Sequence, residues 1–306
     1  MNCRLLSLSC VLLLVASGCA DKDQTETANV EMQAIQAGGT ANGELLEALK
    51  KDMREFEDYR RDNTKGFDGM TEYLNAKKEE RYADWEKAAE AGIPEGGILL
   101  GFYYLFRHST GILDADTKKW FLKAAEQGHA EARFQLARHY SANARSRAPT
   151  DAQEAIHWFR KAGDQGHVRA LFELGGHYNA VVIGNSAFPP DPVEAAKWYR
   201  KAAELGHAES QFRFGSYCLE KVELPNPFTP ENVERFRNES AEGIEWYRKA
   251  AEQGYARAQY WVGMFYYEGL SVPQDMEEAT KWLHKAAEQG EEMADRMLIE
   301  IFAKPR

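Results

Sequence analysis

Eight histidines and four cysteines are the side chains that could bind a metal ion or act as a nucleophile or general base. His129, His167 and His207 each directly follow a glycine, so they occupy one repeated position in a periodic chain. Such repetition indicates a structural role at a helix boundary. No His-Glu-x-x-His, Gly-x-Ser-x-Gly, phosphate-binding loop or dinucleotide motif occurs in the sequence. We therefore expect no catalytic residue, no metal site and no cofactor.

Cys19 is the cysteine whose surroundings predict chemistry. Residues 1–18 carry a single charge, on Arg4, and an apolar run too short for a confident membrane span, which is typical of a secretory signal peptide. The small residues before the cysteine, in Val15-Ala-Ser-Gly-Cys19, resemble the lipobox of bacterial lipoproteins. That resemblance implies cleavage before Cys19 and lipidation of this residue. Cleavage of an ordinary signal at an A-x-A-like site is the alternative.

The residues after Cys19 indicate where the protein would reside. Ala20 stands where an aspartate would retain an enteric lipoprotein in the inner membrane, so the resemblance implies the periplasmic face of the outer membrane. Residues 19–42 are small and polar, and we expect them to form a lipidated flexible tether. Contact with the membrane is then expected through the lipid anchor only.

Charge and cysteine usage limit the possible partners. The formal net charge of −10 becomes −11 once Arg4 leaves with the signal, which argues against nucleic acid and favours a basic protein partner. Cys3 and Cys10 are lost with the signal, and only Cys218 remains beside the lipidated cysteine. No intramolecular disulfide is expected, so the fold must depend on packing alone.

The elements that position these residues are marked by a repeat of Lys-Ala-Ala, once Lys-Ala-Gly, followed by a glycine. The six glycines are separated by 36, 38, 40, 48 and 36 residues: Gly92, Gly128, Gly166, Gly206, Gly254 and Gly290. A period of this length predicts a solenoid, in which each repeat packs on its neighbours.

Each repeat is expected to contain two helices. We count positions from the repeat glycine, so that offset 4 is the fourth residue after it. Apolar or small residues at offsets 4, 8 and 12 lie on one face of the first helix. Offset 9 holds a small residue in the first five repeats. The second helix starts with an aspartate and a glutamate three residues later, which is the spacing of a capping box. These aspartates are Asp151, Asp191 and Asp275. A tryptophan follows seven residues on, and the next glycine ends the helix.

The motif Ala-x-x-x-Leu-Gly-x-x-Tyr, followed by Asp-x-x-x-Ala-x-x-Trp-x-x-Lys-Ala-Ala-x-x-Gly, resembles the Sel1-like repeat, a relative of the tetratricopeptide repeat. Residues Ala258 to Gly290 match it almost position for position. The resemblance implies an all-α fold, a right-handed α-solenoid of helix-turn-helix repeats over residues 84–306. A helical stripe before it predicts an N-terminal helical cap over residues 43–83.

Two positions depart from the repeat motif. Asp84 stands where a tryptophan is expected, with Trp85 one residue later. Ile299 stands where the other first helices have glycine or alanine, which suits a terminal repeat.

The resemblance implies protein binding without catalysis. Some similar lipoproteins are immunity proteins that neutralise phospholipase effectors delivered by type VI secretion, and this is our most specific hypothesis. The alternative is an envelope scaffold or adaptor that assembles or regulates other cell-envelope proteins. A peptidoglycan- or β-lactam-acting enzyme is a remote third possibility. Secreted relatives that have been linked to penicillin binding resemble disulfide-rich chains with paired cysteines in each repeat, and this chain has no such pairs. We expect a monomer that binds a protein partner.

Two surfaces are candidates for partner binding. Offsets 7 and 11 lie opposite the packing face of the first helix, and Trp261, Tyr217 and Phe265 are the expected hot spots. We call these ten residues the stripe; they are Leu99, Gln135, Glu173, Arg213 and Trp261 at offset 7, and Tyr103, His139, His177, Tyr217 and Phe265 at offset 11. Alternatively, offset 11 borders the core and its residues are half-buried packing.

The second candidate surface is formed by the two irregular loops, over residues 179–190 and 219–239. The apolar residues expected to recognise a partner there are Ile183, Phe188, Phe228 and Phe236. The alternative is that these loops fold back and cover the helices.

Overall fold

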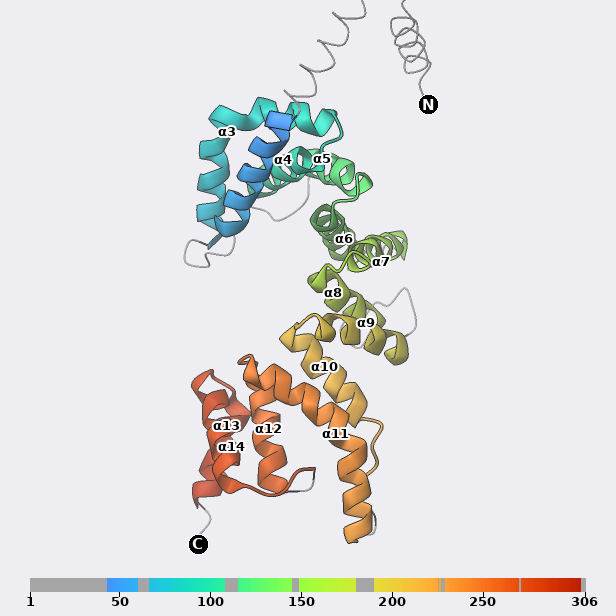
Figure 1. Cartoon of the computed structure of the whole chain (residues 1–306), viewed down its shortest axis with the longest axis vertical. Coiled ribbons are helices and arrows are strands. Elements are labelled where there is room, and N and C mark those ends of the chain that lie inside the picture. Colours follow the sequence, from blue (N-terminus) through green and yellow to red (C-terminus); the bar gives the residue numbers. More distant parts are fainter. Residues whose placement is uncertain are drawn as a thin grey trace, which may run out of the picture. The chain divides into compact units, whose positions relative to one another are not determined.

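The computed structural model describes residues 43–59, 66–107, 115–144, 149–179, 190–224, 226, 229–269 and 271–303. The chain divides into two compact units, Met1–His129 and Ala130–Arg306, and each is described by itself. Every regular element in the described residues is a helix, so the predicted all-α fold is confirmed (Figure 1).

The first unit contains the helix over residues 43–59, α3 (Gly66–Glu90), α4 (Pro94–Arg107) and α5 (Ala115–Glu126). Helix α3 packs against both α4 and α5. It continues without a break through residue 84, where the sequence led us to expect the start of the repeat region. One helix therefore crosses the boundary that was expected between an N-terminal cap and the repeats.

Asp52 joins the helix over residues 43–59 to α3. This carboxylate is buried, and its Oδ2 accepts hydrogen bonds from Trp85 Nε1 and Arg81 Nε, both at 3.0 Å. The same helix contributes Phe56, whose ring lies 4.8 Å from that of Phe102 on α4. Trp85, one residue away from the position expected for the motif tryptophan, thus bonds to the helix over residues 43–59.

The second unit is a series of helix pairs (Figure 1). Its helices are α6 (Ala130–Ala144), α7 (Pro149–Gly163), α8 (Val168–Tyr178), α9 (Pro192–Glu204), α10 (Ala208–Leu219), α11 (Pro230–Glu252), α12 (Ala256–Glu268), α13 (Met276–Glu288) and α14 (Glu292–Ala303). Each helix packs against the next one in the chain.

The repeated glycines end the second helices as the sequence predicts. All six adopt φ between 79° and 97°, a region that L side chains rarely enter. At the fourth of these glycines, Gly206 N donates to Ala203 O at 2.9 Å and His207 N donates to Ala202 O at 3.1 Å. These two bonds form a Schellman motif. The alanines are buried, which explains why small residues precede each glycine.

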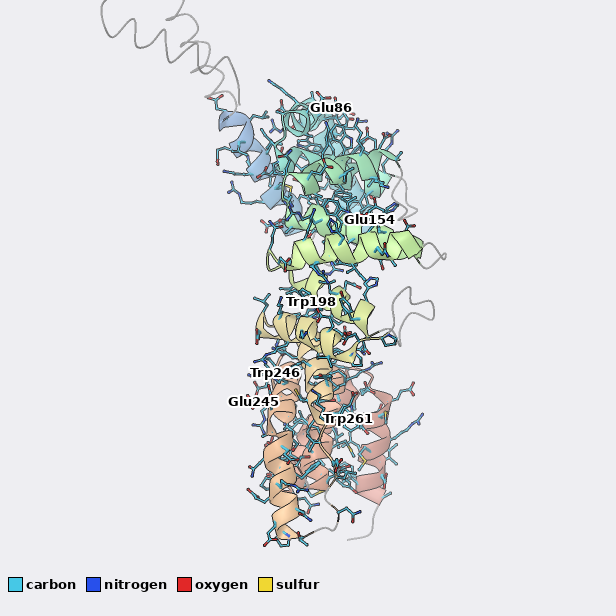
Figure 2. All side chains as sticks on the ribbon, turned by 90° about the vertical axis from the view of Figure 1, so that its right-hand side faces the viewer. Glu86, Glu154, Trp198, Glu245, Trp246 and Trp261 are labelled. Atoms are coloured by element: carbon cyan, nitrogen blue, oxygen red, sulfur yellow. The ribbon has the colours of Figure 1, made fainter. Side chains whose placement is uncertain are left out.

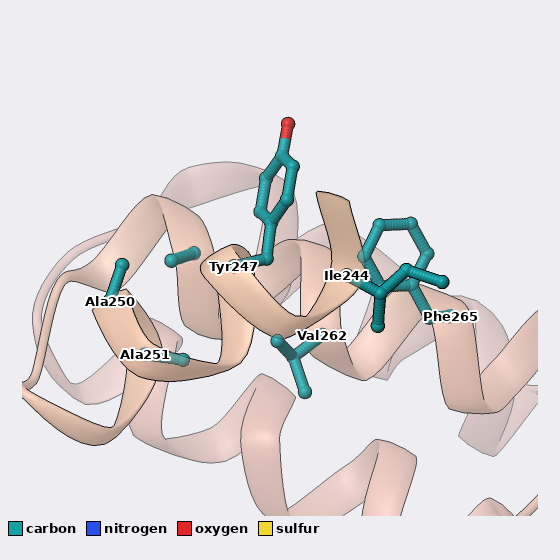
Figure 3. Packing of buried hydrophobic residues seen from close by; sticks show 7 residues of the cluster. Ile244, Tyr247, Ala250, Ala251, Val262 and Phe265 are labelled. Carbon is teal, nitrogen blue, oxygen red and sulfur yellow. The ribbon is translucent and has the colours of Figure 1, made fainter. Parts of the chain in front are cut away.

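Small residues at offset 9 allow the two helices of one repeat to approach closely. A Cβ added to Gly175 would lie 2.5 Å from the ring of Tyr199, and one added to Gly215 would lie 2.9 Å from Tyr247. Tyr247 belongs to a buried cluster in which α11 faces Val262 and Phe265 of α12 (Figure 3). The small residues are therefore required by packing within each repeat.

The helix starts confirm part of the predicted capping. Asp191 Oδ1 accepts from Glu194 N at 2.9 Å, and Asp275 Oδ1 accepts from Glu277 N and Glu278 N at 3.0 Å each. The prediction for Asp151 is wrong, because α7 begins two residues earlier, at Pro149.

Helix α11 begins earlier than expected. Thr229 is its N-cap, with Oγ1 accepting from Asn232 N at 3.3 Å, and Pro230 follows in the first turn. Much of the expected loop over residues 219–239 is therefore helical, and α11 extends well before Trp246.

Candidate protein-binding surface

Several predicted features lie outside the described residues. These are the signal peptide over residues 1–18, the tether over residues 19–42, the lipidation site Cys19, and the loop residues Ile183, Phe188 and Phe228. Phe236 is described, but it lies on α11 and is 8% exposed, so its assignment to an exposed loop is wrong.

The two stripe residues of the first unit are buried, so the expectation that they are exposed is wrong. Leu99 is 0% and Tyr103 3% exposed on α4. For Tyr103 the physical reason is α3: the Tyr82 ring packs edge-on to Tyr103 at 5.9 Å, and Lys78 Nζ lies 5.4 Å from the Tyr103 ring. Neither residue can contact a partner directly.

Two stripe residues of the second unit are also buried, contrary to expectation. Gln135 is 6% exposed, and its Nε2 donates to Glu131 Oε1 at 2.7 Å along α6. Phe265 is 9% exposed because its ring packs at 5.6 Å against Tyr247 in the core between α11 and α12. For Phe265, the alternative that offset 11 borders the core is correct.

The middle of the stripe is half-buried and polar. His139, Glu173, His177, Arg213 and Tyr217 all have intermediate exposure. His177 Nε2 lies 3.2 Å from Ser141 Oγ, which connects α8 to α6, and Arg213 Nη2 donates to Glu209 Oε1 at 3.1 Å. These side chains form a partly solvated surface over successive first helices.

Trp261 is the one exposed residue among the ten stripe positions, all of which the structure describes. It is 41% exposed on α12 (Figure 2). Its ring is held edge-on to Tyr260 at 5.5 Å and lies 6.4 Å from Phe265. A tryptophan that is fixed on one side and open on the other has the properties of a binding anchor.

The tryptophans of the second helices have a different role. Five repeats have a tryptophan in the second helix, and each is followed three residues later by the lysine of Lys-Ala-Ala or Lys-Ala-Gly. In all five, the Nζ of this lysine lies over the indole ring, at 4.2–5.1 Å from the ring centroid. Trp198 and Trp246 are two of them (Figure 2). The sequence reasoning missed this pairing, although the fixed Trp-x-x-Lys spacing was visible.

A groove beside Tyr217 is a further feature that the sequence did not predict. It has a volume of about 340 Å³, and α9, α10 and α11 line it. We call it the Tyr217 groove; its residues are Val193, Ala196, Lys197, Arg200, Phe214, Tyr217, Cys218, Lys221, Glu239 and Glu242. The 48-residue spacing between Gly206 and Gly254 was the signal for it, because the extra residues lengthen α11.

Four of the five charged side chains of the Tyr217 groove lie on two of its helices, and Lys221 is the fifth. Lys197 and Arg200 lie on α9, whereas Glu239 and Glu242 lie on α11. Burial raises the pKa of the Cys218 thiol to about 11, so this cysteine is protonated at neutral pH and is a poor nucleophile.

Two of the three histidines that follow repeat glycines, His167 and His207, cap helices, as expected for a structural role. His167 Nδ1 accepts from Ala170 N at 3.2 Å, and its Nε2 lies 3.1 Å from Glu131 Oε2. Within the described part of the chain, no group of three or more His, Cys, Asp or Glu side chains could hold a metal ion. None of the helices in the described ranges is long and apolar enough to cross a membrane.

Comparison with solved structures supports the fold. A Sel1 repeat protein from Oxalobacter formigenes matches at 24% identity over 83% of this chain and 76% of that chain, with a TM-score of 0.54. A protective antigen of uropathogenic Escherichia coli with an SLR fold matches at 22% identity over 84% and 67%, with a TM-score of 0.44. An immunity protein from Pseudomonas aeruginosa matches at 21% identity over 54% and 67%, with a TM-score of 0.27. The first of these likenesses shows the fold alone.

Comparison with family models identifies the repeat. The model described as Sel1 repeat matches residues 98–129, 130–167, 168–207, 234–255 and 256–291, which together make up more than half of the chain. No match was found among curated proteins. The gap between the third and fourth matches contains α10 and the start of α11, next to the Tyr217 groove. The chain belongs to the Sel1 repeat family.

Proposed function

We propose that this protein is a non-catalytic, protein-binding lipoprotein of the outer membrane's periplasmic face, and that it neutralises a phospholipase effector delivered by type VI secretion. The observation that carries the binding proposal is Trp261, which remains 41% exposed on a face where neighbouring repeats have buried or half-buried residues. The location rests on the lipobox-like sequence that ends at Cys19.

Binding would be centred on Trp261. Arg257, one turn earlier on α12, is exposed, and Met293 on α14 is 53% exposed at offset 3 of the next repeat. An aromatic anchor with an adjacent cation and a flexible thioether suits a surface that excludes water from a partner side chain. Neutralisation requires only that the partner's active site or membrane-binding surface be covered, so no catalytic group is needed on this chain.

Periplasmic co-expression tests the proposed function. A phospholipase encoded beside this protein's gene should kill cells when it is exported alone and should be tolerated when the full chain is present. Trp261→Ala should reduce this protection. Met276→Ala is the matched control, because Met276 is also 41% exposed but lies on α13, a second helix. Full protection should persist in the control.

The same experiment separates immunity from the scaffold alternative. If cells that lack the protein survive the exported phospholipase as well as cells that carry it, the immunity function is wrong. A defect of the cell envelope in the deletion strain, without any toxin, would then favour an envelope scaffold.

A further inference from the structure

Cys218 lines the Tyr217 groove at a position where other repeats have a tyrosine. This position is offset 12 of the first helix, and on α10 the half-buried Cys218 occupies it. Four of the six repeats have a tyrosine there, which are Tyr104, Tyr140, Tyr178 and Tyr266. Because a cysteine is much smaller than a tyrosine, the substitution leaves space open between the neighbouring second helices, α9 and α11.

Tyrosines at offset 12 bond to an arginine of the preceding second helix. Arg160 Nη2 on α7 donates to Tyr178 Oη at 2.8 Å. In the same way, Arg248 Nη2 on α11 donates to Tyr266 Oη at 3.3 Å. Both arginines stand two residues after the tryptophan of their helix, and Arg200 on α9 stands at the same position and lines the groove. The groove therefore has the arginine of this pair but lacks the phenol ring.

Arg200 can donate to such a ring although it is already paired on its own helix. Its Nε donates to Glu204 Oε1 at 2.9 Å, and that bond uses neither Nη atom. Arg248 shows that the two contacts are compatible, because its Nη1 lies 3.9 Å from Glu245 Oε2 while its Nη2 bonds to Tyr266. The proposed contact thus requires no ion pair to break.

The walls of the groove suit an aromatic ring. Phe214 stands where the other first helices have leucine or valine, and its ring lies 5.7 Å from that of Trp246 and 6.5 Å from that of Tyr217. Aromatic rings attract one another at such distances. Glu242 on α11 also lines the groove, and its carboxylate can accept a hydrogen bond from a hydroxyl. The volume of about 340 Å³ has room for one phenol ring and the backbone that carries it.

We propose that the Tyr217 groove binds a tyrosine side chain of a protein partner, with the ring against Phe214 and the hydroxyl bonded to Arg200. The bound ring takes the place that Tyr178 and Tyr266 fill in their own repeats. A single side chain makes a small contact, so we expect a dissociation constant on the order of 1 mM for an isolated tyrosine with a capped backbone. This proposal goes beyond the proposed immunity function and does not depend on it.

Ligand-observed NMR of the mature chain, with Cys19→Ser so that no lipid is attached, tests the proposal. The probe is N-acetyl-tyrosinamide, and the comparison probe is N-acetyl-phenylalaninamide, which lacks the hydroxyl. We expect saturable binding of the tyrosine probe and about fivefold weaker binding of the phenylalanine probe, because Arg200 then has no oxygen to which it can donate. A third probe, p-cresol, is the phenol ring without the backbone.

Arg200→Met should remove most of the preference for the tyrosine probe. Arg200 is exposed, so the variant should keep the helical content of the wild type. Arg296→Met is the matched control, because Arg296 is also exposed and paired with a glutamate of its own helix, but it lies on α14 outside the groove. The control should retain the full preference.

Variants of Cys218 test the missing ring itself. Cys218→Tyr should fill the groove with a side chain of this chain and abolish the binding of both capped probes. Cys218→Ala leaves the groove open and should bind them as the wild type does. Should Cys218→Tyr lose helical content, the comparison of Arg200→Met with Arg296→Met still decides the role of the groove.

Four outcomes would overturn the proposal. One is no saturable binding of N-acetyl-tyrosinamide up to roughly twenty times the expected dissociation constant. Another is a preference for the tyrosine probe that persists in Arg200→Met. The third is unchanged binding in a folded Cys218→Tyr variant. The fourth is binding of p-cresol without binding of N-acetyl-tyrosinamide, because the groove would then admit small phenols but no tyrosine of a polypeptide.

Discussion

Trp261 combines the two properties that a binding residue needs, a rigid position and an open ring face. Its neighbours Tyr260 and Phe265 fix the indole, while 41% of the residue is exposed. A fixed aromatic ring loses little conformational entropy when a partner covers it. At the same scale, His167 and His207 are structural groups, since both cap first helices through Nδ1.

The cap at His207 makes stability depend on pH. Its Nδ1 accepts from Ser210 N at 3.3 Å and lies 2.8 Å from Ser210 Oγ, and burial lowers the pKa of the ring below its usual 6.5. The folded state therefore favours the neutral ring. Its stabilising contribution is complete above the unfolded pKa, and it is lost as the pH falls through the lower, folded pKa.

Urea unfolding between pH 8 and pH 5 measures this effect. We expect His207→Asn to lose less stability than the wild type on acidification, by about 1 kcal/mol, because asparagine caps a helix without titrating. His284→Asn, which changes an exposed histidine, should follow the wild type. Identical pH dependence in wild type and His207→Asn would contradict the cap as the cause.

At the scale of the helix pair, the offset-9 residue sets the distance between the two helices of a repeat. Gly175 contacts the Tyr199 ring, and Gly215 approaches both Tyr247 and the carbonyl oxygen of Gly243. The sequence predicted these contacts because the small residue recurs in five copies. It could not predict the early start of α11 or the length of α3, because both extend beyond the repeat unit.

Neighbouring glycines on α8 allow a matched test of this packing. A Cβ on Gly175 would meet the Tyr199 ring at 2.5 Å, whereas a Cβ on Gly176 would have only Tyr199 Oη nearby, at 3.9 Å. We expect Gly175→Ala to lower the free energy of unfolding by about 1–3 kcal/mol. Gly176→Ala should raise it by about 0.5–1 kcal/mol, through the lower entropy of the unfolded chain.

Thermal and urea unfolding would measure the free energy of unfolding of Gly175→Ala, Gly176→Ala and the wild type. Equal stabilities for Gly175→Ala and Gly176→Ala would show that the close contact with Tyr199 does not limit packing.

At the scale of the whole chain, the repeat was predictable and the binding surface only partly so. The six regularly spaced glycines predict the fold class, and the family match over more than half of the chain agrees with that prediction. The position of Trp261, opposite the packing face of its helix, also identified it as a candidate binding residue. The repeat pattern could not show that part of α3 covers Tyr103, or that α9, α10 and α11 line a groove, because these depend on elements outside the regular repeat.

The affinity for a protein partner tests most directly whether the first-helix face binds through Trp261. We would titrate the mature chain, with Cys19→Ser, against a catalytically inactive form of the phospholipase encoded beside its gene, and measure Kd by calorimetry. Trp261→Ala should raise Kd at least tenfold at unchanged helical content, which corresponds to about 1.4 kcal/mol or more of lost binding free energy. Met276→Ala should leave Kd unchanged. An unchanged Kd for Trp261→Ala would contradict the central claim and move the interface away from the first-helix face.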